Sequence, residues 1–159
     1  MNLNNSDLIV IGEINTASMI IFWFHGYGSN NWSFEPVMKM LNLSMENDVC
    51  IIMPNAPNVD SKRSWYPLPI SNSTGAIKED HDGLRESKNH ISKFIKSFKL
   101  GKEQNIIIGG FSQGAALSLS MLFETDHIFN GCIALSGYMP SAEYHKNFEI
   151  AECNIFIAH

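Results

Sequence analysis

The chain alternates between short apolar runs and longer segments with helical periodicity, and this alternation limits the folds open to it. The runs are continuously apolar and bounded by glycine and proline, which is typical of strands buried on both faces of a parallel sheet. The pattern therefore predicts an α/β fold with a mostly parallel sheet, right-handed crossovers and helices on both faces. The expected strands are Leu8 to Ile11, Met19 to Phe24, Val49 to Met53, Asn105 to Ile108, Cys132 to Leu135 and Asn154 to Ala158.

Two segments between these runs have the patterns of helices. Glu79 to Lys99 carries its apolar residues on one face and lysine and glutamate on the other, and Leu100-Gly101 ends it. Gln113 to Phe123 is apolar around most of its circumference, so we expect a buried helix packed on the sheet. The stretch Asn55 to Ala76 is rich in proline, serine and asparagine, which indicates a long surface loop that shapes a ligand site.

Composition narrows the class of protein and its partners. A chain of 159 residues suffices for one domain, taken as residues 1–159. The net charge of −5 argues against nucleic acid or an anionic membrane as the main partner. Three cysteines lie far apart without C-x-x-C spacing, so we expect small buried side chains in a reducing cytoplasm. No cluster has metal-ligand spacing, and no metal cofactor is implied.

The sequence has no pattern typical of a signal peptide or of a membrane span. Residues 1–7 are polar and contain no basic region. The longest wholly apolar run, Met19 to Phe24, is far shorter than the ~20 residues of a membrane span. We therefore expect a soluble protein without stable membrane insertion.

The segment Gly110-Phe111-Ser112-Gln113-Gly114 matches the pattern G-x-S-x-G. An isoleucine-rich strand leads in and a helix of small residues leads out, which is the setting of a nucleophile elbow. The flanking glycines are required because strand and helix backbones pass too close for a side chain. Ser112 is thus the expected nucleophile, with the Gln113 N–H donating to the oxyanion at the helix N-terminus. The alternative is a glycine-rich strand–helix turn without catalysis.

A second glycine-containing loop, His25-Gly26-Tyr27-Gly28, directly follows a predicted strand. Such a loop brings a backbone N–H toward the elbow, and we assign this second oxyanion donor to Tyr27. His25 lies at the strand end that builds the loop, so we expect a structural histidine that bonds nearby backbone rather than a catalytic base.

Four motifs occur in order along the chain: His25-Gly-Tyr-Gly, Met53-Pro-Asn-Ala-Pro, Gly109-Gly-Phe-Ser-Gln-Gly and Ala134-Leu-Ser-Gly-Tyr-Met-Pro. Together they resemble the phospholipase/carboxylesterase family of α/β-hydrolases, which includes the acyl-protein thioesterases, from about residue 8 to residue 159. The resemblance implies hydrolysis of carboxylic esters or thioesters through an acyl-serine intermediate. It implies Ser112 as nucleophile, Tyr27 and Gln113 as oxyanion donors, and Trp65 as a substrate-binding residue.

The chain departs from the family pattern at three places. Ser29 and Ala115 replace an aspartate and a glycine that are usual in the family. Trp65-Tyr66 is followed by Pro67-Leu68 rather than by an acidic residue. These departures predict altered acyl-chain preference and leave the nucleophile in place.

The remaining triad members are expected after the nucleophile, in the order acid and then histidine. The family's acid follows a His-Gly pair after a strand, and His159 would be the histidine of that pair. By this resemblance the chain ends before both groups, so we expect a hydrolase fold incomplete at its C-terminal end and inactive alone. Asp126 and His127 follow the nucleophile helix, which places them at the opposite end of the sheet from Ser112. Glu143 and His145 follow the fifth strand on the correct edge, so a substitute acid and base from this pair is conceivable.

These observations leave more than one function open. The leading hypothesis is an esterase or thioesterase acting on a small-molecule or acylated-protein substrate. The alternative is a catalytically inactive, hydrolase-like protein that binds a partner through the cleft near Trp65. A dehydrogenase is disfavoured because no G-x-G-x-x-G follows the first strand. We also expect an uncovered apolar sheet edge, and hence instability or self-association.

Overall fold

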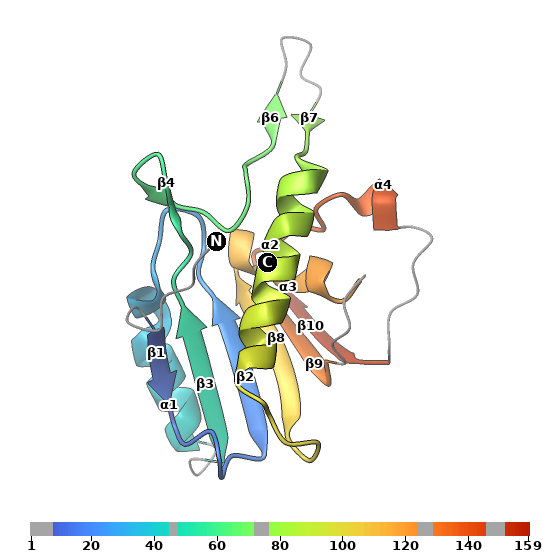
Figure 1. Ribbon diagram of the computed structural model, residues 1–159. Coiled ribbons are helices and arrows are strands. Elements are labelled where there is room, and N and C mark those ends of the chain that lie inside the picture. The colour runs from blue at the N-terminus through green and yellow to red at the C-terminus, as the bar shows by residue number, and fades with distance from the viewer. Residues whose placement is uncertain (1–7, 45–47, 72–76, 124–128, 146–151) are drawn as a thin grey trace.

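The computed structural model describes residues 8–44, 48–71, 77–123, 129–145 and 152–159 (Figure 1). A six-stranded sheet forms the centre, with the strand order β1-β3-β2-β8-β9-β10. β1 runs antiparallel to β3, and every other neighbouring pair of this sheet is parallel. Its strands are β1 (Leu8–Ile11), β2 (Met19–Phe24), β3 (Val49–Pro54), β8 (Asn105–Phe111), β9 (Gly131–Leu135) and β10 (Asn154–Ala158). The predicted α/β fold is confirmed.

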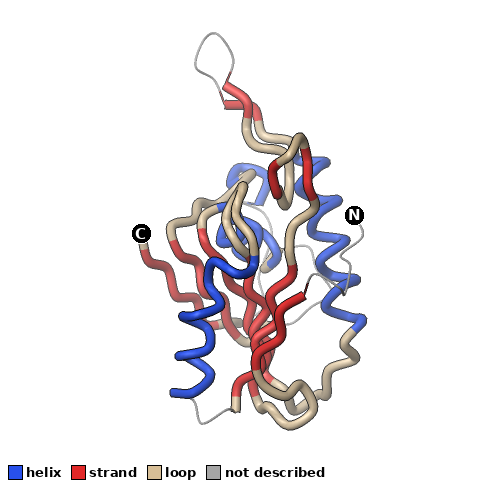
Figure 2. Tube along the Cα trace, turned by 90° about the vertical axis from the view of Figure 1, so that its left-hand side faces the viewer, coloured by secondary structure: helices blue, strands red, loops and turns tan. Residues whose placement is uncertain are grey.

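Helices cover both faces of this sheet (Figure 2). On one side, α2 (His81–Ser97) and α3 (Gln113–Met121) pack over a core that contains Phe22, Phe24 and Trp65. On the other side lies α1 (Glu35–Ser44), next to a 3-10 helix η2 (Asn31–Phe34). A short helix, α4 (Ala142–His145), follows β9.

Alternation along β2 explains why two cores form. Ile20, Phe22 and Phe24 face the α2 and α3 side, whereas Ile21 and Trp23 face the α1 side. All five side chains are buried, as expected of a central strand in a parallel sheet. Among the described helices, none is long and apolar enough to cross a bilayer.

The stretch 55–76 is only partly the surface loop that the sequence predicted. It contains one short hairpin, β4 (Asn58–Val59) with β5 (Lys62–Arg63), and the strand β6 (Ile70–Ser71), which pairs with β7 (Ile77–Lys78) just after the stretch. Trp65 and Tyr66, which lie between β5 and β6 in the sequence, are buried, at 1% and 4% exposure. The segment packs on the core because burial of two large aromatic side chains removes a large apolar surface from water, which a solvated loop would leave exposed.

The β4–β5 hairpin turns on Asp60 and Ser61, which have φ angles of 48° and 67°. Positive φ at both central residues defines a type I′ turn, where the second position favours glycine. We expect Ser61→Gly to raise the free energy of unfolding by about 1 kcal/mol, because it removes the Cβ strain of the left-handed backbone. Thermal denaturation tests this, and an unchanged or lower midpoint would contradict it.

The edge strand β10 exposes apolar side chains on both of its faces. Ile155, Phe156 and Ile157 are 41%, 60% and 63% exposed, and the strand carries no charge. Beside it, on the face that carries α1, lies an apolar hollow of about 380 Å³. Met19, Ile21, Ile107, Ile133 and Ile155 contribute to its lining. Uncharged edges of this kind pair with other chains.

We therefore expect the chain to self-associate with rising concentration, and Phe156→Lys to shift it toward the monomer. Met40→Lys is the matched control, because Met40 is 71% exposed on α1, away from the edge. Sedimentation velocity over a concentration series measures the effect. A monomer at every concentration, with a sharp two-state melt, would contradict the expectation.

Candidate active site

Ser112 occupies a strained turn between β8 and α3. Its φ of 52° and ψ of −115° lie outside the regions that residues with a Cβ normally adopt. Two backbone bonds hold the turn: the Ser112 N–H donates to Leu135 O at 2.8 Å, and the Ala116 N–H donates to Ser112 O at 3.0 Å. The strand–turn–helix context that the sequence predicted for Ser112 is therefore present.

The glycines of the elbow are required by a close approach of backbones. A Cβ on Gly110 would lie 2.6 Å from the carbonyl carbon of Gly114. A Cβ on Gly114 would lie 2.7 Å from His25 O and would collide with the carbonyl of Phe24. The steric reason inferred from the sequence is confirmed, and the opposing backbone belongs to the end of β2.

The loop after β2 runs beside Ser112. A Cβ on Gly26 would lie 3.4 Å from the Cβ of Ser112, which places this loop in contact with the elbow. Gln113 is the first residue of α3, where backbone N–H groups lack an intrahelical acceptor and favour negative charge. Tyr27 is 39% exposed, with the Lys62 ammonium 5.6 Å from the centre of its ring. That the N–H groups of Tyr27 and Gln113 bind an oxyanion stays a prediction.

His25 is buried at the base of this loop and bonds backbone at both ring nitrogens. The Ala56 N–H donates to Nε2 at 3.0 Å, so the ring proton resides on Nδ1. Nδ1 then donates to Gly26 O at 2.8 Å. These bonds agree with the structural role expected for His25.

The Gln113 side chain, which the sequence analysis did not use, ties the elbow to the segment around Trp65. Its Oε1 accepts the Trp65 N–H at 3.0 Å, and its Nε2 donates to Tyr66 O at 2.8 Å and to Ser64 Oγ at 3.1 Å. The residue is buried, at 3% exposure, with its amide hydrogen-bonded through both atoms. Gln113 thus joins α3 to a loop almost fifty residues earlier in the chain.

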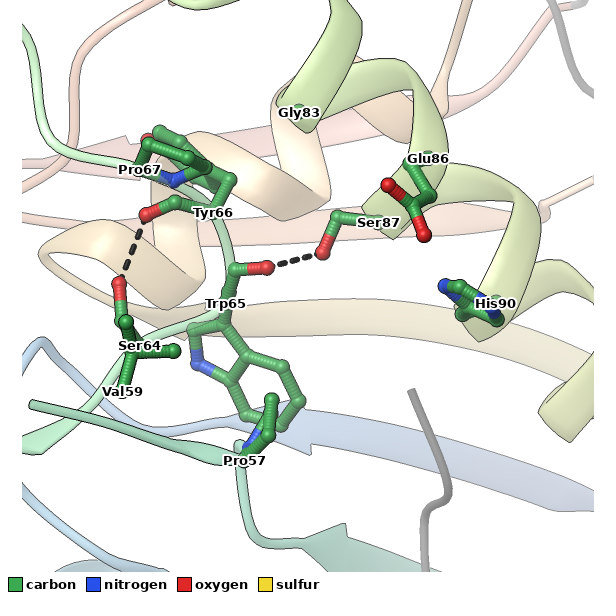
Figure 3. A pocket seen from close by; sticks show the side chains of 10 residues that line it. All are labelled: Pro57, Val59, Ser64, Trp65, Tyr66, Pro67, Gly83, Glu86, Ser87 and His90. Atoms are coloured by element: carbon green, nitrogen blue, oxygen red, sulfur yellow. Dashed lines mark hydrogen bonds between the residues drawn. The ribbon is translucent and has the colours of Figure 1, made fainter.

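Trp65 is held in the core rather than displayed on the surface. Its Nε1–H donates to His25 O at 2.7 Å, and Ser87 of α2 donates to its carbonyl. The indole forms one wall of a small pocket of about 170 Å³ that also includes Pro57, Glu86 and His90 (Figure 3). Substrate binding by Trp65 stays a prediction, and its 1% exposure favours a role in shaping the site.

A group of polar side chains joins three segments around Tyr66, and the sequence analysis did not identify it. The hydroxyls of Tyr66 and Tyr138 lie 3.2 Å apart, and burial is the main cause that raises the pKa of each. Glu79 accepts the Ser141 N–H, and His81 Nδ1 bonds Ser141 Oγ, each at 2.5 Å. These bonds join the segment after β9 to the N-terminus of α2.

The acid and base candidates are divided between described and undescribed parts of the chain. Asp126 and His127 lie outside the described residues. Glu143 is exposed on α4, and His145 is the last residue of that helix. His159 follows β10 and is exposed. That Glu143 and His145 substitute for the acid and base stays a hypothesis.

Two of the three cysteines are buried core side chains, as the sequence predicted, whereas the burial expected of the third is wrong. Cys50 and Cys132 are buried, and burial raises their pKa values to about 11 and about 12. Cys153 is partly exposed. Within the described residues, no three histidine, cysteine, aspartate or glutamate side chains converge on one point.

A mostly parallel sheet with a serine in a strained strand–turn–helix elbow, beside the loop of a neighbouring strand, defines the α/β-hydrolase class. The family model for phospholipase/carboxylesterase matches residues 4–159. The chain therefore belongs to the phospholipase/carboxylesterase family, as its motifs suggested.

Its relatives include acyl-protein thioesterases. The acyl-protein thioesterase 1 homolog 1 of Dictyostelium discoideum is 39% identical over 142 residues, covering 82% of this chain and 62% of the relative. Acyl-protein thioesterase 1 of Candida albicans is 31% identical over 150 residues, covering 83% and 64%. The chain thus spans less than two thirds of the length of these relatives.

Solved structures agree on the fold. Acyl-protein thioesterase 2 of Zea mays superposes with a TM-score of 0.73 at 23% identity, covering 88% of this chain and 65% of that one. The carboxylesterase of Bacillus cereus superposes with a TM-score of 0.72 at 16% identity, covering 94% and 68%. At these identities the likeness extends to the fold alone.

The close approach at the elbow makes a direct prediction. We expect Gly114→Ala to lower the free energy of unfolding by about 3 kcal/mol, because its Cβ has no space beside Phe24 and His25. Gly101→Ala is the matched control, since its nearest contact would be an ordinary 3.6 Å, and we expect a change within about 0.5 kcal/mol. Urea denaturation of both variants measures the difference, and equal midpoints would contradict the steric argument.

Proposed function

We propose that this chain carries the nucleophile and oxyanion site of a carboxylic ester or thioester hydrolase. The observation that supports this most is the strained elbow at Ser112. A positive φ at a residue with a Cβ costs stability, and such strain between a strand and a helix is typical of a catalytic serine. The names of the relatives, acyl-protein thioesterases, favour thioesters of acylated proteins among the substrates, beside small-molecule esters.

The proposed reaction follows from the geometry around Ser112. Its Oγ attacks the carbonyl carbon and forms a tetrahedral intermediate, whose oxyanion accepts bonds from the N–H groups of Tyr27 and Gln113. The intermediate collapses by breaking the C–O or C–S bond, which releases an alcohol or a thiol and leaves an acyl-serine. Water then hydrolyses this ester. A base must take the Ser112 proton in the first step and return it to the leaving group.

The setting proposed for this activity follows from the composition. A net charge of −5 disfavours nucleic acid as a partner. The free thiols of Cys50, Cys132 and Cys153 are compatible with a reducing compartment, so we propose the cytoplasm.

The test is covalent labelling of Ser112 by a fluorophosphonate, followed by intact-mass analysis, with Ser112→Ala as control. We expect stoichiometric labelling when a base reaches Ser112, and none in the control. The same assay is run on a chimera that continues after His159 with the following sequence of the Dictyostelium relative.

Each outcome decides between the candidate functions. Labelling of the 159-residue chain means that its own residues activate Ser112. Labelling of the chimera alone supports a hydrolase whose base lies in further sequence. Failure of both, with both proteins folded, would reject the hydrolase and favour a hydrolase-like binding protein.

A further inference from the structure

The β4–β5 hairpin is bonded to the loop after β2, at the same end of the sheet (Figure 1). The Gly28 N–H donates to Arg63 O at 2.7 Å. The Arg63 guanidinium Nη1 donates to Ala56 O at 2.9 Å. Arg63 thus contacts the loop directly through its backbone and indirectly through its side chain.

The side-chain contact continues as a chain of hydrogen bonds. Ala56, whose carbonyl accepts from Arg63, donates its own N–H to His25 Nε2 at 3.0 Å. This bond keeps the proton of His25 on Nδ1, which donates to Gly26 O at 2.8 Å. The Ser29 N–H donates to the same carbonyl at 3.1 Å.

The orientation of Gly26 O matters because of peptide geometry. The carbonyl of Gly26 and the N–H of Tyr27 belong to one planar trans peptide group, in which they point in opposite directions. Two donors hold the Gly26 carbonyl on one side, so the Tyr27 N–H is held on the other. The adjoining N–H, that of Gly28, is held by Arg63 O.

We propose that Arg63 is a positioning residue that orients the Tyr27 N–H toward the oxyanion at Ser112. The inference rests on the proposed function and extends it to a residue that does not touch the reacting atoms. A donor that is already oriented before the reaction costs no reorganisation, which is the source of its catalytic effect. The partly buried Arg63 supplies a charged donor to Ala56 O, and such bonds are stronger than neutral ones.

The test compares Arg63→Met with Arg63→Lys and with a matched control, Arg85→Met. Arg85 is an exposed arginine on α2 whose guanidinium pairs with Asp82 at 2.7 Å. Two quantities are measured: the kinetics of Ser112 phosphonylation by a fluorophosphonate, and the amide exchange rates of Gly28, Ser29 and Ala56 by NMR. In the labelling step, Ser112 Oγ forms the P–O bond, the P–F bond breaks and releases fluoride, and the hydroxyl proton passes to the base.

We expect Arg63→Met to lower the maximal rate of phosphonylation by about tenfold to a hundredfold, with the inhibitor's apparent binding constant unchanged. A general loss of structure would change both constants. Arg63→Lys should recover part of the rate, because its ammonium can still donate to Ala56 O. Amide exchange at Gly28, Ser29 and Ala56 should quicken at least about tenfold in Arg63→Met and stay unchanged in Arg85→Met.

Two results overturn the proposal: equal maximal rates in Arg63→Met and Arg85→Met, or unchanged exchange at the three amides. If the parent chain is not labelled, the phosphonylation rates are measured on the chimera and the exchange rates on the chain itself. If neither protein is labelled, the proposed function has failed, whereas the exchange rates still decide whether Arg63 orders the loop. If Arg63→Met does not fold, Ser61→Gly is added to stabilise the hairpin, and the same two measurements apply.

Discussion

The contact between the end of β2 and the first turn of α3 is the constraint on which the rest of the site depends. Because Gly110 and Gly114 lack side chains, the backbone of the elbow closes onto the carbonyls of Phe24 and His25. β2 and β8 are paired in register up to Phe24 and Gly110, so the chains that leave both strands emerge side by side. One of these chains carries Ser112, and the other carries the loop from His25 to Gly28. A larger residue at either glycine would separate the nucleophile from the loop proposed to stabilise its oxyanion.

The segment from Ala56 to Tyr66 secures this arrangement from outside the sheet. It bonds to the loop after β2 through Ala56, Arg63 and the Trp65 indole, and to α3 through the Gln113 amide. These polar groups lie in or near the core, where an unpaired donor or acceptor costs about 1–3 kcal/mol. The bonds are therefore mutually required, and displacement of the segment would leave several buried groups unsatisfied at once. A rigid backbone around the proposed oxyanion site follows from this requirement.

Sequence patterns sufficed for the sheet and the elbow because both depend on local signals. The six strands of the central sheet, the helices α2 and α3, and Ser112 between glycines were predicted to within a few residues at their ends. The signals that failed depend on contacts distant in sequence. Nothing local to Gln113 indicates that its amide bonds residues 64–66, and the Pro- and Ser-rich surroundings of Trp65 indicated a solvated loop. The β4–β5 turn was missed because Asp60-Ser61 lacks the glycine that usually marks a type I′ turn. α1 was not predicted, although Asn30 caps η2, which leads into it.

Ser112 is also connected to the far edge of the sheet through the ends of the strands. The Ser112 N–H donates to the last carbonyl of β9, that of Leu135, and the Ser136 N–H donates to the last carbonyl of β10, that of Ala158, each at 2.8 Å. Ser112 and Ser136 share a left-handed backbone, with φ angles of 52° and 50°. The turn that ends β8 is thus hydrogen-bonded to β9, and the turn that ends β9 is hydrogen-bonded to β10. Leu135 O and the Ser136 N–H belong to the same peptide group. The bond from Ser136 to β10 therefore helps to orient the carbonyl that accepts from Ser112. The most exposed strand of the sheet is therefore two hydrogen bonds from Ser112, and whatever orders β10 also orders the elbow.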